Sequence, residues 1–289
     1  MQFIKSQLIL LVKNKLIIES GSTKTDWVII TASQNLKFTT LGINPAANEN
    51  LFDLNQECAD LLKHSNTISE IHYFGAGVID DKTRLIIRDW LDIYFKQTEN
   101  FTIESDMLGA AKAVARDKAG IISILGTGSN SCVYDGNEIK ANIPALGFAL
   151  SNEGGGSKIG GELIKAYFYK KLPEDVRDEF EQRFKISKSD VVEQIYKGDN
   201  PTAYLANYAR FLNETENKEW RKSFLFPLFQ EFIDIRIKQY SEYLQYDLHF
   251  VGSIAYFYAD VIRDILQYNG LQCSSIIQKP IDGLVDYYK

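Results

Sequence analysis

Two stretches of the sequence combine glycine with small hydroxylated residues, a composition that suits phosphate binding. In the first, Leu16–Ile30, a polar turn separates two apolar runs. Glycine lets a backbone turn tightly and approach a ligand, hydroxyls donate hydrogen bonds, and the N–H groups of such a turn can point at an anion. The residues of this turn expected at a phosphate are Gly21, Ser22, Thr23, Lys24 and Thr25.

The second stretch, Gly120–Tyr134, repeats the order of apolar strand, glycine-bearing turn and apolar strand. A single turn of this kind is equally well explained as an ordinary polar hairpin, and Lys24 lacks the Gly-x-x-x-x-Gly pattern of a Walker loop. Two copies in one chain favour a duplicated fold that holds a phosphate between its halves. The second set of expected phosphate ligands is Gly126, Thr127, Gly128 and Ser129.

Asp106 stands between a short predicted strand, Phe101–Ile103, and a predicted helix. Ligands of α/β sheets bind at the carboxyl ends of strands, so a carboxylate here is placed to act as general base toward a substrate hydroxyl. Such a base typically contributes about 10²–10⁴-fold in rate. The alternative is a helix N-cap, a common position for Asp, and the two roles can coexist.

Other polar residues flank the two turns. Glu19 and Asp26 bracket the first turn, and Mg²⁺ takes carboxylate and phosphate oxygens, with Glu19 the better candidate because it ends a buried strand. Asn152 and Glu153 precede three glycines, a run that indicates either close approach of a ligand or a mobile loop. The strand at 247–255 runs into Gly252 and a helix, which can present backbone N–H groups to a nucleotide.

The elements that must position these residues alternate along the chain. The expected strands include 16–18, 27–30, 36–40, 71–74 and 101–103, and the expected helices include 48–65, 83–95, 108–115, one ending at Tyr167, and 256–268. A charged, helix-rich stretch without a sheet signal occupies 173–246. This order predicts mixed sheets covered by helices, an α/β class.

Composition narrows the class of partner. The 289 residues suit two domains, and the net charge of −6 argues against nucleic acid as a main partner. The three cysteines show no metal spacing, which predicts free thiols and a cytoplasmic protein, and the scattered histidines are interpreted as structural. The apolar run before Val12 is too short to span a membrane, so residues 1–15 are interpreted as an additional N-terminal segment.

Taken together, the chain resembles the N-acetylglucosamine kinase branch of the BadF/BadG/BcrA/BcrD ATPase family, in the actin, sugar kinase and heat-shock-70 superfamily. The resemblance covers nearly the whole chain from Leu16. Each motif is weak alone, and their order and spacing make the resemblance specific. The matching blocks are 20–27, 42–45, 75–77, 105–111, 125–130 and 251–255.

The resemblance implies two ribonuclease-H-like domains, 1–106 and 107–289, with a cleft between them and a helical insertion at 173–246. It implies phosphoryl transfer from ATP with Mg²⁺ to a hydroxyl of N-acetylglucosamine or a related amino sugar, with Asp106 as base and Glu19 at the metal. A homodimer is left open. The residues it places at the sugar are Asn44, Gly75, Ala76, Gly77, Asn130, Asn152 and Glu153, and at the adenosine Gly252, Ser253 and Ala255.

Two positions depart from the family's pattern. The family usually has Asp at the position of Glu19, and Asp-Glu-Gly-Ser where this chain has Asn-Glu-Gly-Gly at 152–155. A shift of about 1 Å in such a site can reduce the rate about 10²-fold, so weak activity or an altered substrate is expected. One alternative is therefore a sugar or nucleotide sensor without catalysis. Another, an ATPase that activates a partner reductase, is disfavoured because the cysteines do not cluster for an iron–sulfur centre.

Overall fold

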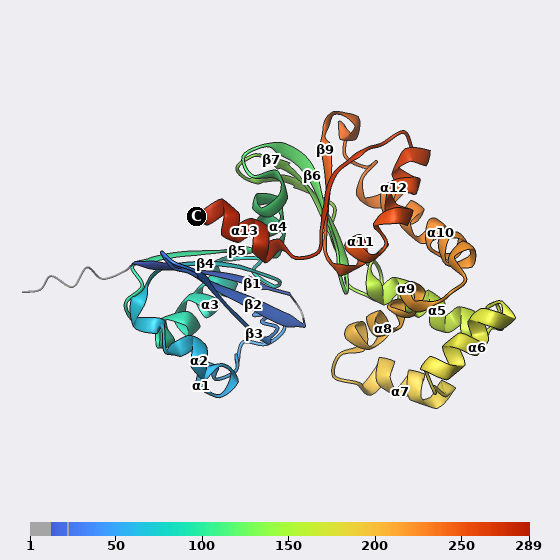
Figure 1. Ribbon diagram of the computed structural model, residues 1–289, viewed down its shortest axis with the longest axis horizontal. Helices are drawn as coiled ribbons and strands as arrows, with labels where there is room; N and C mark the ends of the chain where they lie inside the picture. Colours follow the sequence, from blue (N-terminus) through green and yellow to red (C-terminus); the bar gives the residue numbers. More distant parts are fainter. Residues whose placement is uncertain (1–12, 22) are drawn as a thin grey trace, which may run out of the picture. The chain divides into compact units, whose positions relative to one another are not determined.

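A computed structural model describes residues 13–21 and 23–289, and the chain forms two compact units, each built on a five-stranded mixed sheet (Figure 1). The first unit comprises the described residues up to Gly109 together with Leu284–Lys289, and the second comprises Ala110–Gly283. The sequence suggested one division, after residue 106. In the structure the end of the chain returns to the first unit.

The sheet of the first unit has the order β3-β2-β1-β4-β5. Its strands are β1 (Asn14–Ser20), β2 (Lys24–Ile30), β3 (Asn35–Leu41), β4 (Ile68–Gly75) and β5 (Asn100–Ser105). Strand β1 runs antiparallel to β2 and parallel to β4, which is parallel to β5. The carboxyl ends of β1, β4 and β5 therefore meet at one edge, where Ser20 pairs with Gly75 and Gly75 with Ser105.

Side-chain alternation along β4 assigns the two faces of this sheet. Ile71 and Tyr73 join the buried core to which α3 (Asp81–Tyr94) contributes Ile87 and Leu91. The opposite face receives the end of α13 (Pro280–Tyr288), where the Tyr288 ring stacks on His72 with centroids 3.9 Å apart. Figure 1 shows α3 on one side of the sheet and the end of α13 on the other. Helix α4 (Asp106–Ala115) begins in the first unit directly after β5 and continues into the second.

The single helix predicted at 48–65 is wrong. The segment forms α1 (Leu54–Glu57), α2 (Ala59–Leu62) and the 3₁₀ turn η1 (Ser65–Thr67). Asp53 accepts a hydrogen bond from the Asn55 N–H, which starts α1 later than the apolar spacing suggested. Cys58 then has φ −153° and ψ 68°, outside the helical region, and this residue separates α1 from α2.

The second unit repeats the scheme, with the order β10-β9-β6-β7-β8. Its strands are β6 (Ala119–Leu125), β7 (Ser129–Asp135), β8 (Ile139–Asn142), β9 (Asp247–Val251) and β10 (Cys273–Ile277). Strands β6 and β7 form the second glycine-bearing hairpin, and β6 is parallel to β9. Two matching strand–turn–strand units confirm the predicted duplication, whereas β10 and α13 were not predicted.

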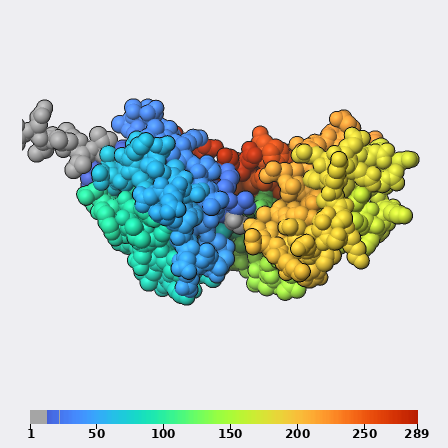
Figure 2. Space-filling view, turned by 90° about the horizontal axis from the view of Figure 1, so that it is seen from below, coloured from blue at the N-terminus to red at the C-terminus, as the bar shows by residue number. Residues whose placement is uncertain are grey.

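Helices fill the predicted helix-rich stretch of the second unit. Within 173–246 these are α6 (Glu174–Arg183), α7 (Lys188–Lys197), α8 (Pro201–Ala209), α9 (Phe211–Glu214), α10 (Lys218–Arg236) and η2 (Tyr243–Gln245). The unit also contains α5 (Gly156–Phe168) before the stretch, and α11 (Ser253–Phe257) and α12 (Ala259–Tyr268) after it. Residues of this stretch, yellow to orange in Figure 2, form much of the visible surface of the second unit. Across the described residues, no helix has the length and apolar character to cross a membrane.

Candidate functional site

In the first unit, Asp106 lies directly after the carboxyl end of β5, as the sequence predicted. It is the first residue of α4, and its Oδ1 accepts a hydrogen bond from the Met107 N–H at 2.8 Å. The N-cap position belongs to Ser105, whose hydroxyl accepts the Leu108 N–H at 3.3 Å. Both side chains therefore accept N–H groups at the start of α4, so the capping role considered for Asp106 is shared with Ser105.

The half-buried carboxyls of Asp106 and Glu19 both influence the buried Tyr73 hydroxyl. Burial raises the pKa of the Asp106 carboxyl above its ordinary value, and the hydrogen bond from Met107 partly opposes this. The fully buried Tyr73 phenol has its pKa raised chiefly by burial and further by the charges of Asp106 and Glu19. The carboxylates of Glu19 on β1 and Asp106 on α4 therefore both raise the pKa of the Tyr73 hydroxyl at the carboxyl edge of the sheet.

Those carboxylates suit a hard cation such as Mg²⁺, which prefers oxygen ligands. The residues that the structure describes contain no group of three or more His, Cys, Asp or Glu side chains that could hold a metal by themselves. Mg²⁺ usually keeps waters and takes substrate phosphates beside one or two carboxylates, so Glu19 fits it as part of a nucleotide complex.

The turn between β1 and β2 is fixed by its own side chains. The Gly21 N–H donates to the Lys24 carbonyl at 3.0 Å, and the Ser20 and Thr25 hydroxyls are 2.8 Å apart. Thr25 also donates to the Leu41 carbonyl at 2.9 Å, and Ser20 accepts the Ile43 N–H at 2.9 Å. The buried Thr25 hydroxyl, predicted at a phosphate, ties the turn to the loop after β3.

Charged residues of the same turn pair with each other. Lys24 Nζ lies 2.8 Å from Asp26 Oδ2, and the Thr39 hydroxyl donates to Asp26 Oδ1 at 3.1 Å. Both oxygens of Asp26 are therefore engaged by side chains of the same sheet. Thr23 is exposed, and Ser22 lies outside the described residues.

Two of the blocks predicted near the sugar contact each other. Gly77 has φ +78°, a left-handed conformation that favours glycine, and a Cβ there would overlap Asn44 Oδ1. That oxygen also accepts the N–H groups of Ala46 and Ala47 at 3.2 Å each. The Ala76 N–H donates to the Ser20 carbonyl at 2.9 Å, so these blocks lie at the sheet edge that carries Asp106.

In the second unit, the glycine turn packs directly against the start of α5. The N–H groups of Gly156 and Ser157 donate to the carbonyls of Gly126 and Thr127, both at 2.8 Å. A Cβ at Gly155 would lie 2.7 Å from the Gly128 carbonyl carbon. The glycine run at 154–156 is buried, so the mobile loop considered from the sequence is wrong, and the backbone that comes close is the turn itself.

Asn152 braces this contact. It has φ +73°, its Oδ1 accepts the Ser129 N–H at 3.4 Å, and its Nδ2 donates to the Ser157 hydroxyl at 3.1 Å. The side chain predicted at the sugar thus joins the glycine turn to α5. The Ser129 hydroxyl is buried and has no hydrogen-bond partner among the described residues, as expected of a group that awaits a polar ligand.

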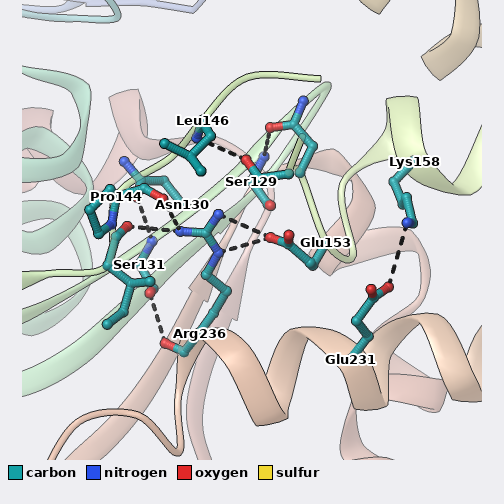
Figure 3. Close-up of polar contacts among 12 residues, drawn as sticks. Ser129, Asn130, Ser131, Pro144, Leu146, Glu153, Lys158, Glu231 and Arg236 are labelled. Carbon is teal, nitrogen blue, oxygen red and sulfur yellow. Dashed lines mark hydrogen bonds and ion pairs between the residues drawn. The ribbon is translucent and has the colours of Figure 1, made fainter. Parts of the chain in front are cut away.

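Glu153 forms a buried ion pair with Arg236 at the end of α10 (Figure 3). The Nε and Nη2 atoms of Arg236 each lie 3.0 Å from Glu153 Oε2. Its Nη1 donates to the carbonyls of Ile143 and Pro144 at 2.8 and 3.0 Å. A single guanidinium therefore joins α10, the segment after β8 and the segment before α5.

The predicted adenosine residues adjoin the glycine turn. Gly252 has φ +118°, and a Cβ there would overlap the Leu125 carbonyl oxygen at the end of β6. Ser253 is exposed, whereas Ala255 is fully buried in the core and serves packing. A cavity of about 340 Å³ opens beside α11 and is lined by Ala113, Tyr256, Ile276, Ile277, Gln278, Lys279, Asp282 and Gly283.

Comparison with solved structures places the chain in a family. A candidate N-acetylglucosamine kinase from Porphyromonas gingivalis superposes with a TM-score of 0.89 at 33% identity, over 94% of this chain and 98% of that chain. The chain belongs to the N-acetylglucosamine kinase-like family. No family model and no curated protein sequence matches it.

Two more distant structures share the fold of this N-acetylglucosamine kinase-like protein. A candidate N-acetylglucosamine kinase from Chromobacterium violaceum gives a TM-score of 0.62 at 12% identity, over 96% of this chain and 100% of that chain. The MamK double helical filament gives 0.53 at 12% identity, over 94% and 97%. The predicted two-domain α/β actin-like fold is confirmed.

Sequence reasoning missed two residues of the N-acetylglucosamine kinase-like chain. Tyr73 was taken only as part of an apolar strand, although its hydroxyl lies within the field of Asp106 and Glu19. Arg236 was passed over in a charged helical stretch, and it stands 83 positions from Glu153. The sequence offered one signal that Arg236 is buried: it lies among the apolar residues Phe232, Ile233 and Ile237. All four side chains are buried in the structure.

Proposed function

We propose that the protein transfers a phosphoryl group from ATP to a hydroxyl of N-acetylglucosamine or a related amino sugar. The observation that carries the proposal is the 33% identity, over nearly the full length of both chains, with the Porphyromonas gingivalis protein. The position of Asp106 directly after the carboxyl end of β5 supports it. The more distant structures contribute the fold alone.

In this reaction, Asp106 accepts the proton of the sugar hydroxyl as that oxygen bonds to the γ-phosphorus. The bond between the γ-phosphorus and the β–γ bridging oxygen breaks, and ADP leaves. Burial raises the pKa of the Asp106 carboxyl, so its ionised form is a stronger base than an exposed carboxylate. Glu19 would hold Mg²⁺, which neutralises phosphate charge when bound.

The remaining roles divide between groups that bind and groups that brace. We assign phosphate binding to backbone N–H groups of the two turns, to Thr23 and to the buried Ser129 hydroxyl. Thr25 and Asn152 act by holding the turns in place. The groups assigned to the sugar are Asn44, Gly75–Gly77, Asn130 and Glu153. Phosphoryl transfer depends mostly on such positioning, so the bracing residues matter to rate as well as to stability.

The test is a panel of neutral and amino sugars in a coupled ADP-release assay, with the sugar phosphate identified by mass spectrometry. We expect ADP release to depend on an N-acylated amino sugar and to fall at least about 10²-fold in Asp106→Asn. Undiminished sugar-dependent turnover in that variant would remove Asp106 from the mechanism. Sugar or ATP binding by calorimetry, without any sugar phosphate, would overturn the kinase proposal in favour of a sensor.

A further inference from the structure

Arg236 and Glu153 form an almost fully buried pair. Arg236 is 1% exposed and Glu153 is 7% exposed. Both contacts between the two side chains go to Glu153 Oε2, so Oε1 is not used by the pair. Two guanidinium N–H groups directed at one oxygen hold that oxygen in place and balance the charge of the carboxylate.

The same guanidinium fixes the base of an apolar loop. It binds the carbonyls of Ile143 and Pro144, after which the chain exposes Leu146 (61%) and Leu150 (76%). The loop is closed by the Leu146 N–H, which donates to the Ser151 hydroxyl at 2.9 Å. Figure 3 shows Arg236 reaching from α10 to Glu153 on one side and to Pro144 on the other.

A second set of contacts anchors Arg236 to β7. The Ser131 hydroxyl donates to the Arg236 carbonyl at 2.7 Å and lies 2.8 Å from the Tyr240 hydroxyl. Ser131 follows Asn130, a residue expected at the sugar, whose Oδ1 accepts the Asn142 side chain at 3.2 Å. The network therefore surrounds the sugar residues of the second unit and connects them to the helices at 174–236.

We propose that Arg236 positions and neutralises Glu153, and thereby makes the site select a neutral, N-acylated amino sugar over one that carries a free ammonium group. The inference rests on the proposed function. An unpaired carboxylate at Glu153 would attract an ammonium group, whereas a paired one offers Oε1 as a hydrogen-bond acceptor without excess charge. The neighbouring Asn152 adds no charge.

A purely structural ion pair is the competing explanation, because buried pairs are common and contribute little net stability. The two explanations differ in what they predict for selectivity. A structural pair affects stability and overall activity together. A positioning and neutralising residue changes the ratio of kcat/KM for N-acetylglucosamine to that for glucosamine while KM for ATP stays constant.

The experiment measures that ratio at pH 7 in wild type, Arg236→Gln, Arg236→Lys, Glu153→Gln and the Arg236→Gln/Glu153→Gln double variant. We expect Arg236→Gln to lower the ratio about tenfold or more, since it unmasks the Glu153 charge. Arg236→Lys keeps the charge and loses the planar contact, so it should preserve the ratio and raise KM for the sugar. The double variant contains neither charge, so its ratio should return toward that of wild type.

Arg221→Gln is the matched control. Arg221 lies on the same helix, is also buried, and pairs with Asp260 away from the loop at 143–150. This variant should lose stability without a change in the sugar ratio.

If wild type phosphorylates a sugar but Arg236→Gln leaves the ratio unchanged, the inference fails and the proposed function stands. If wild type phosphorylates no sugar, both fail. Should Arg236→Gln not fold, an equal loss of activity toward both sugars in Arg236→Lys, without a rise in KM, would overturn the inference.

Discussion

Replacement of Gly155 by alanine tests whether the glycine run positions the turn at 126–129, to which we assign phosphate binding. Gly155 has φ −79° and ψ 160°, which alanine adopts without strain. Any effect of the substitution therefore comes from the contact of the new Cβ with Gly128 and not from backbone strain. The new Cβ would lie 2.7 Å from the Gly128 carbonyl carbon and 2.9 Å from its oxygen. These atoms are backbone and cannot rotate away, so the turn or α5 must move.

The size of the movement follows from van der Waals contact. Carbon atoms pack at about 3.5–4.0 Å, so the turn must retreat by roughly 0.8 Å or more if it absorbs the whole shift. Overpacking of this kind typically costs about 1–3 kcal/mol in the free energy of unfolding. A misplacement approaching 1 Å near the reacting groups lowers the rate by up to about 10²-fold. We therefore expect kcat/KM for ATP to fall about 10- to 100-fold.

Gly161 is the control in the same helix. A Cβ at Gly161 would meet no atom within 4 Å. Gly161→Ala should therefore stabilise the protein by about 0.5–1 kcal/mol through the unfolded-chain entropy of glycine, without a change in kinetics. Thermal or denaturant unfolding and steady-state kinetics with varied ATP measure both effects. Full activity in Gly155→Ala, at unchanged stability, would show that the contact between the turn and α5 does not control the site.

Three other substitutions test the remaining parts of the site. Asp106→Asn should raise the free energy of unfolding at neutral pH while it abolishes turnover. Because the pKa of Asp106 is raised in the folded protein, folding favours its protonated form. The stability that this form contributes is fully present below the pKa of the unfolded chain and is lost as the pH rises through the pKa of the folded protein. Equal stability of the two proteins at neutral pH in denaturant titrations would contradict this. Gly252→Ala should destabilise by more than about 1 kcal/mol and raise KM for ATP, because φ is +118° and the Cβ overlaps Leu125; a wild-type melting curve and KM would count against it. Glu19→Asp should raise turnover or Mg²⁺ affinity in metal titrations, and no change in either would show that the additional methylene is harmless.

Apolar runs and glycine-bearing turns predicted much of the fold, because strands and hairpins depend on residues that are close in the sequence. Both hairpins were recognised from apolar runs around glycine, and Asp106 was placed correctly because the end of a strand is visible in sequence. The helix at 48–65 failed because the apolar spacing continues through Cys58, whose backbone leaves the helical region. Strand β10 was overlooked because it is short and its residues are mostly only half-buried.

The roles of the polar site residues were harder to predict, because they depend on contacts between distant segments. The glycine run at 154–156 reads the same in sequence whether a ligand or a neighbouring turn approaches it, and here the turn at 126–128 does so. Glu153 was expected to be a sugar ligand, with no sign that Arg236 holds one of its oxygens. Propensity and periodicity carry no information about such pairs.

The two departures from the family's usual residues have unequal consequences. At position 152, the side chain accepts the Ser129 N–H and donates to the Ser157 hydroxyl, and a carboxylate could accept hydrogen bonds from both groups with the same reach. Asparagine therefore keeps the brace and omits a charge beside the glycine turn, where a carboxylate would repel the phosphates of the proposed ATP complex. Position 19 offers no such equivalence, because the additional methylene of glutamate moves its oxygens away from where those of an aspartate would lie, close to the half-buried Asp106 and the buried Tyr73. Any loss of activity relative to the family should accordingly be recovered at residue 19 and not at residue 152.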